Sequence, residues 1–72
     1  MTLTVIFNNH RLAVDACNAL GGVGCCVIPG PKRKMGQEEL IVDFPPATPK
    51  KTRRLERIAS GIVQDYSGKI VL

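Results

Sequence analysis

The apolar residues of this chain change their spacing from a period of two to a period of about 3.6 and back, twice within 72 residues. A period of two is typical of a β-strand, whose side chains alternate between two faces, and the longer period is typical of one face of a helix. In order, the segments predict a strand, a helix, two strands, a helix and a strand. A chain of this length has room for one domain, and we expect residues 1–72 to form it.

Each predicted strand is short and consists mainly of β-branched or other apolar residues in alternation. The predicted strands cover residues 2–7, 25–28, 40–44 and 69–72. Leu3, Val5 and Phe7 share one face of the first strand, and Pro29 is expected to end the second.

Two longer segments carry helical stripes and have end signals of their own. Asn8 or Asn9 is expected to cap the first helix, and Gly21-Gly22 to end it. Thr48 is the predicted N-cap of the second helix, with Pro49 at its first position. The buried stripes are expected to be Ala13, Ala16, Cys17 and Leu20 in the first helix and Leu55, Ile58, Ala59, Ile62, Val63 and Tyr66 in the second.

This element order predicts an α/β (α+β) domain of the ferredoxin-like βαββαβ type. Its four-stranded antiparallel sheet would carry both helices on one face, over a mainly aliphatic core. The other face would then be open, and Ile6, Ile41 and either Cys26 or Ile28 would form an apolar strip on it. Formation of a homodimer through that face or a strand edge is one expectation. The alternative is that these are scattered surface aliphatics, which are common.

The three cysteines, Cys17, Cys25 and Cys26, are odd in number and two are adjacent, so they do not suggest a disulfide framework. We expect reduced thiols in a cytoplasmic protein. The first residues lack the pattern of a signal peptide, and no apolar run is long enough to cross a membrane. No membrane partner is therefore expected.

No constellation of catalytic or metal-ligating residues is visible, so we predict no catalytic residue, metal or cofactor and expect that the protein is not an enzyme. Adjacent Cys25 and Cys26 would point to opposite faces of a strand and would not bind one metal ion together. His10 is the one histidine, and the sequence shows neither a nucleophile nor an orienting partner for it. A cysteine-based carrier or enzyme is a remote alternative.

The run from Phe7 through Ala13 and Leu20 to Ile28-Pro29-Gly30-Pro31 resembles small βα domains proposed as sulfur or selenium carriers. The resemblance covers less than half of the chain. Those domains carry a cysteine after the proline motif, and residues 32–39 contain none here, so no function is carried over.

The net charge is +4, and seven of the ten lysines and arginines lie in two clusters. The first cluster is Lys32, Arg33 and Lys34, and the second is Lys50, Lys51, Arg53 and Arg54. Short charged runs often serve simply as solvated surface. The second cluster, however, falls in the first turns of a helix, where the helix dipole makes cations unfavourable and free N–H groups attract anions. We therefore predict that these seven residues bind an anionic group or partner.

The predicted topology places the two clusters at opposite ends of the sheet, with residues 8–11 near the first. The leading hypothesis is a small non-enzymatic interaction or regulatory module that binds a macromolecular partner, namely an acidic protein surface, through its basic segments and open sheet face. Binding of nucleic acid through its phosphates is the alternative. The β-sheet RNA-recognition module is not matched, because Phe7 and Phe44 are expected in the core instead of on a stacking platform.

Overall fold

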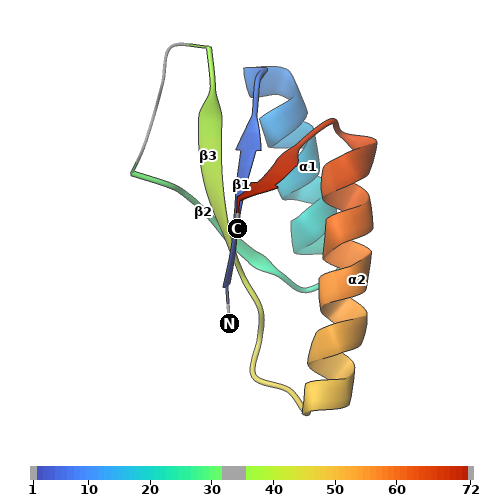
Figure 1. The fold of residues 1–72 in the computed structure, drawn as a ribbon. Helices are drawn as coiled ribbons and strands as arrows, with labels where there is room; N and C mark the ends of the chain where they lie inside the picture. Colours follow the sequence, from blue (N-terminus) through green and yellow to red (C-terminus); the bar gives the residue numbers. More distant parts are fainter. Residues whose placement is uncertain (1, 32–35, 72) are drawn as a thin grey trace.

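The computed structural model describes residues 2–31 and 36–71, which form six elements around one core (Figure 1). The elements are β1 (Thr2–Phe7), α1 (His10–Gly22), β2 (Cys26–Pro29), β3 (Glu38–Asp43), α2 (Pro49–Asp65) and β4 (Lys69–Val71). The strands form one sheet in the order β2-β3-β1-β4, and every neighbouring pair is antiparallel. The predicted α+β class, four-stranded antiparallel sheet and two helices are therefore confirmed.

Both helices cover the same face of the sheet, on the right in Figure 1. The alternation of the strands explains why this face is apolar: Val5 and Phe7 on β1, with Leu40 and Val42 on β3, are all buried. From the helices, the buried residues are Ala13, Ala16, Leu20, Ala59 and Val63. Alanine at three of these positions lets the helices lie close to the sheet, so a small set of aliphatic and aromatic side chains closes the core.

Both predicted helix starts are confirmed by side-chain caps. Asn9 Oδ1 accepts the N–H of Arg11 at 2.8 Å and that of Leu12 at 3.3 Å. Thr48 Oγ1 accepts the N–H of Lys51 at 3.3 Å. These bonds satisfy donors that have no partner inside the helix, and each cap therefore sets the residue at which its helix begins.

The predicted end of α1 at Gly21-Gly22 is confirmed, because Gly22 is the last residue of the helix. The chain then turns at Gly24, whose φ of 97° favours a residue without a Cβ. Strand β2 lies one residue later than predicted. Pro29 was expected to stop the strand after Ile28, but it is the last residue of β2. Because β2 is an edge strand, the missing N–H of Pro29 costs no hydrogen bond within the sheet.

Ile58 departs from the predicted buried stripe of α2, since 44% of its surface is exposed. The other stripe residues, Leu55, Ala59, Ile62, Val63 and Tyr66, are buried in the core or packed against it. Successive helical residues are about 100° apart, so Ile58 falls at the margin between the core-facing side and the solvent-facing side. Its exposure makes it available for contact with another molecule.

Candidate functional site

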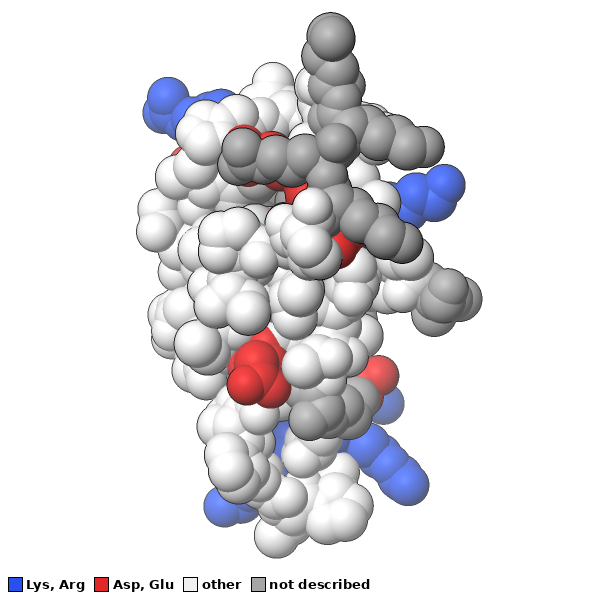
Figure 2. Space-filling view, turned by 90° about the vertical axis from the view of Figure 1, so that its left-hand side faces the viewer, with Lys and Arg blue, Asp and Glu red and all other residues white. Residues whose placement is uncertain are grey.

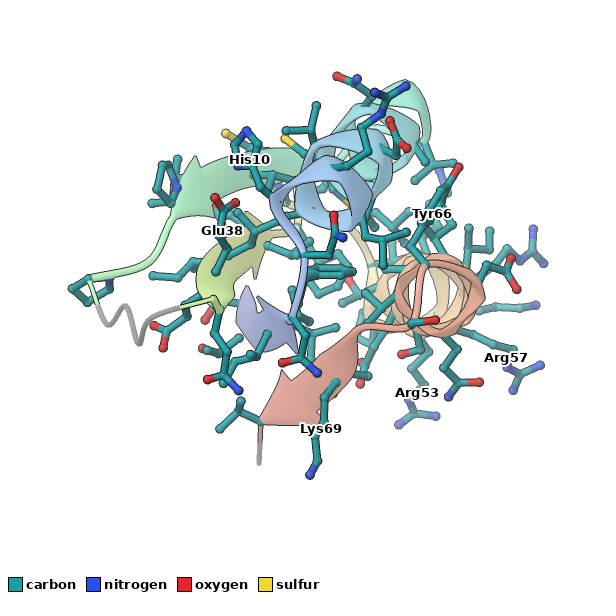
Figure 3. The ribbon with its side chains drawn as sticks, turned by 90° about the horizontal axis from the view of Figure 1, so that it is seen from above. His10, Glu38, Arg53, Arg57, Tyr66 and Lys69 are labelled. Atoms are coloured by element: carbon teal, nitrogen blue, oxygen red, sulfur yellow. The ribbon has the colours of Figure 1, made fainter. Side chains whose placement is uncertain are left out.

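Four basic residues of α2 lie on its solvent-facing side. Lys50, Arg53, Arg54 and Arg57 follow the i, i+3, i+4, i+7 spacing that places residues on one helical face, and all four are exposed. Together with Pro49 they line one surface hollow. Figure 3 shows Arg53 and Arg57 pointing outward from the helix. We call these four residues the basic stripe.

The amphipathic pattern of α2 determines where the basic stripe lies. Ala59 and Val63 are fully buried, and the basic stripe occupies the opposite side of the helix. No carboxylate in the described part of the chain pairs with the basic stripe, because each ion pair found there involves a residue of α1 instead. The basic stripe therefore presents positive charge that the described residues do not neutralise.

The charges of α2 are placed against its dipole. Its first turn contains Lys50 and Lys51 and no acidic residue, while its last residue is Asp65 and its last turn has no basic residue. Each such placement costs about 0.3–1 kcal/mol, because the start of a helix carries partial positive charge and its end partial negative charge. A helix optimised for stability alone would show the reverse arrangement. This distribution favours a binding role for the basic stripe.

The structure brings the predicted site residues Lys50, Arg53 and Arg54 together and places Lys51 beside them in the first turn of α2. Arg57 also belongs to the basic stripe, although the cluster predicted from the sequence did not include it. The spacing in the sequence could have identified this residue, because Arg57 follows Arg53 by four positions and so returns to the same helical face. The other predicted cluster, Lys32, Arg33 and Lys34, lies outside the described residues.

The turn from β1 into α1 lies at the end of the sheet opposite the start of α2 (Figure 1), and residues around this turn line a second hollow. Its lining residues are Asn8, Asn9, His10, Arg11, Gly36, Gln37 and Glu38. Gln37 Nε2 donates to Asn8 Oδ1 at 3.1 Å, and His10 Nδ1 pairs with Glu38 Oε1, toward which it points in Figure 3. These contacts tie the start of β3 to the β1–α1 turn.

Glu38 supplies His10 with a partner that sequence reasoning missed, because the two residues are 28 positions apart. A general base also needs a nucleophile or a substrate proton within reach. No serine, threonine, cysteine or tyrosine of the described residues lines this hollow, and 75% of the His10 side chain is exposed. We interpret the pair as a surface contact worth at most about 1 kcal/mol.

The face of the sheet away from the helices is open, and we call it the open face. Its central row is Ile28, Ile41, Thr4 and Val71, which the strand register places side by side across all four strands. Ile28 and Val71 expose 50% and 44% of their surface. Figure 2 looks onto this side and shows mostly uncharged side chains over its middle. Of the expected apolar strip, Ile28 and Ile41 lie side by side in this row, whereas Ile6 belongs to the neighbouring row and Thr4 stands between Ile41 and Val71.

Metal-binding clusters and membrane-spanning helices have specific requirements that the described residues do not meet. No three histidine, cysteine, aspartate or glutamate side chains within 2–31 and 36–71 lie close enough to hold one metal ion. No helix in these ranges is both long and apolar enough to cross a bilayer. Cys25 is buried and Cys26 exposed, so the two thiols lie on opposite faces, as predicted.

The thiol of Cys26 is expected to react with an aromatic disulfide reagent much faster than that of Cys25. Burial raises the pKa of the Cys25 thiol, so the reactive thiolate is rarer there. Labelling of the folded protein should show a fast phase that Cys26→Ser removes and Cys17→Ser leaves intact. Loss of that phase in Cys25→Ser would contradict this assignment.

The raised pKa of Cys25 also gives stability a pH dependence. The folded protein holds this proton more tightly than the unfolded chain does. The resulting stabilisation is fully present below the ordinary thiol pKa of about 8.5 and is lost as the pH rises through the higher pKa of the folded state. Thermal unfolding of the wild type and of Cys25→Ser across this range measures the contribution.

Comparison with known proteins gives no match. No family model, no curated protein and no solved structure matches the chain.

Proposed function

We propose that this protein is a small non-enzymatic interaction module that binds an acidic macromolecular surface, in the first place that of a protein, through the basic stripe of α2. The supporting observation is that the four cations of the basic stripe share one hollow and have no carboxylate partner among the described residues. Guanidinium and ammonium groups in this state are free to donate charge-assisted hydrogen bonds to the carboxylates of a partner.

Two features favour an acidic protein surface. Exposed Ile58 lies one turn after Arg54 and flanks the basic stripe, and interfaces between proteins combine apolar contacts with a polar rim. From Lys50 to Arg57 the basic stripe is about 10 Å long, given a rise of about 1.5 Å per residue. That length matches two turns of a partner helix with acidic residues on one face.

Binding to nucleic acid phosphates is the second candidate, and the arginine content favours it. Three of the four residues of the basic stripe are arginines, whose planar guanidinium donates two parallel bonds to one phosphate. The open face, in contrast, shows no stacking platform in the described ranges, because Phe7 and Phe44 are buried. Such contacts would therefore involve the nucleic acid backbone and not the bases.

An acidic helical peptide tests the first candidate by fluorescence anisotropy. The peptide carries glutamates on one face over two turns and a leucine beside them, to meet the basic stripe and Ile58. It should bind more tightly than a peptide of the same composition in scrambled order, because the scrambled peptide cannot align its charges with the basic stripe. Equal binding of the two peptides would contradict recognition of acidic residues arranged on one face of a partner helix.

A labelled duplex DNA tests the second candidate in the same assay. If each of the four cations neutralises one phosphate, the logarithm of the binding constant should fall with that of salt concentration at a slope of about −3.6. Tighter binding of the duplex than of the peptide, with this slope, would favour nucleic acid as the partner. Absence of binding to either probe at low salt would exclude the basic stripe as a binding site.

We also infer that the fold is of the ferredoxin-like type. Read from its other edge, the sheet order is β4-β1-β3-β2. Each helix therefore connects two strands that have a third strand between them: α1 leads from β1 to β2 across β3, and α2 leads from β3 to β4 across β1. This split connection is the property that defines the arrangement.

A further inference from the structure

We propose that the open face pairs with the open face of a second copy of this chain, so that the protein forms a two-fold dimer. This inference does not depend on the function proposed for the basic stripe. Its basis is the pattern of apolar and charged side chains across the four strands.

The row next to the central row, toward the β1–α1 end of the sheet, contains two charges. Across β2, β3, β1 and β4 it consists of Gly30, Glu39, Ile6 and Lys69. Neither Glu39 nor Lys69 forms an ion pair with another described residue. Figure 3 shows Lys69 pointing away from the two helices. We call this row the charged row.

The Glu39 side chain extends sideways from β3 over β2. Its Oε1 lies 2.5 Å, and its Cγ 2.6 Å, from the position that a Cβ would take on Gly30. The missing side chain of Gly30 therefore makes room for the carboxylate at the β2 edge. Lys69 belongs to β4, at the opposite edge of the sheet. The open face thus carries a negative charge at one edge and a positive charge at the other.

A two-fold axis parallel to the strands brings these charges together. It places β2 of one copy opposite β4 of the other and keeps the rows aligned. Lys69 of each copy then stands over Gly30 of the other, where the Glu39 carboxylate lies. In the central row, Ile28 stands over Val71. Two lysine–carboxylate pairs would lie beside an apolar centre, as in other protein interfaces.

The other two-fold arrangement, with its axis across the strands, is electrostatically unfavourable. Glu39 and Asp43 lie toward opposite ends of β3 and both face the open side. An axis across the strands would exchange the two ends and place Glu39 of one copy opposite Asp43 of the other. Like charges so placed repel each other, so charge selects the first arrangement.

The strand edges are poorly suited to pairing, which leaves the open face as the better surface. Hydrogen bonds alternate along an antiparallel strand, so every second N–H of an edge strand points outward. In β2 the outward positions are Val27 and Pro29. Only Val27 can donate an N–H to another strand, because Pro29 has none. Strand β4 has three residues and offers that of Ile70. Short edges that contain proline resist the addition of another strand.

The size of the open face sets the strength expected of the dimer. Four strands about 4.8 Å apart, with up to six residues at about 3.3 Å each, give a face of about 400 Å². A standard interface buries about 800 Å² on each partner. We therefore expect a weak dimer that is populated at high protein concentration.

Charge exchange tests the dimer by sedimentation equilibrium, with protein concentrations up to about 1 mM because interfaces of this size are weak. Glu39→Lys alone and Lys69→Glu alone each create two like-charge pairs and should weaken the dimer at least about tenfold. The double variant restores opposite charges and should return the dissociation constant to within about threefold of the wild type. Lys50→Glu makes the same charge change outside the open face and should leave dimerisation unchanged.

Ile41→Lys provides a second check at the centre of the open face. It should abolish dimerisation while the cooperative unfolding transition is retained, because Ile41 faces away from the helices. A wild-type protein that stays monomeric at about 1 mM would overturn the proposal. A dimer that survives Ile41→Lys, or a double variant as weak as the single ones, would overturn it as well.

Discussion

Replacement of Phe7 with alanine is expected to lower the free energy of unfolding by about 3–5 kcal/mol, the range for loss of a buried aromatic ring. Phe7 is fully buried, and a Cβ on Gly68 would lie 2.5 Å from its Cε1, so the ring is tightly enclosed. A domain of this size has a total stability of about 4–11 kcal/mol. The variant should therefore lose much of its stability, and its thermal midpoint should fall by more than about 12 °C.

Ile6 is the matched control for Phe7, because it precedes Phe7 on β1 but points to the open face. Ile6→Ala should lower the free energy of unfolding by about 1 kcal/mol or less, as is usual for a side chain outside the core. Thermal and urea unfolding of both variants measure the difference. Equal losses would mean that the two faces of the sheet do not differ in burial as described.

Reversal of the basic stripe, by Lys50→Glu, Arg53→Glu, Arg54→Glu and Arg57→Glu together, is expected to weaken binding of the anionic probes more than about 100-fold. A hydrogen bond to a charged group contributes about 1.5–3 kcal/mol, so loss of two such bonds is already sufficient. The new glutamates would also repel the probe. Fluorescence anisotropy with the acidic peptide and the duplex measures the loss.

The same reversal should not weaken the fold, which separates a binding defect from unfolding. Lys50→Glu places a negative charge in the first turn of α2, where the helix dipole favours it by about 0.3–1 kcal/mol. Repulsion among four glutamates replaces repulsion among four cations, so mutual repulsion within the stripe contributes no net change in stability. The thermal midpoint at low salt should therefore stay the same or rise. A fall of the midpoint would contradict the unfavourable charge placement described for α2.

Arg11→Glu is the matched control for Arg53→Glu. Each substitution lowers the net charge from +4 to +2, and each replaces an exposed arginine in an early turn of a helix. Arg53→Glu should weaken probe binding at least about tenfold, and Arg11→Glu much less, because Arg11 lies at the other end of the sheet. Equal weakening would assign binding to net charge and not to the basic stripe.

Together the two proposals describe a dimer with two separate binding surfaces. The helices cover the face of the sheet opposite the open face, so the basic stripes would lie on the two outer sides of the dimer. Such an arrangement would let one dimer join two partners, or bind one partner at two places with a gain in apparent affinity.

Much of the local structure could be predicted from the sequence, because caps and periodic faces depend on neighbouring residues. Thr48 and Asn9 cap their helices through bonds that span two or three residues. Prediction failed where the signal was less direct. Pro29 was expected to stop β2, but it is the last residue of that strand, because an edge strand tolerates a missing N–H.

The sequence alone therefore determined the two faces of each element, because helix and strand periods are local geometry. The tertiary structure decided which strands are neighbours and in which register. That choice set Ile28 beside Ile41 and Glu38 beside His10. Strand pairing depends on hydrogen bonds and burial between distant segments, which no short stretch of sequence records.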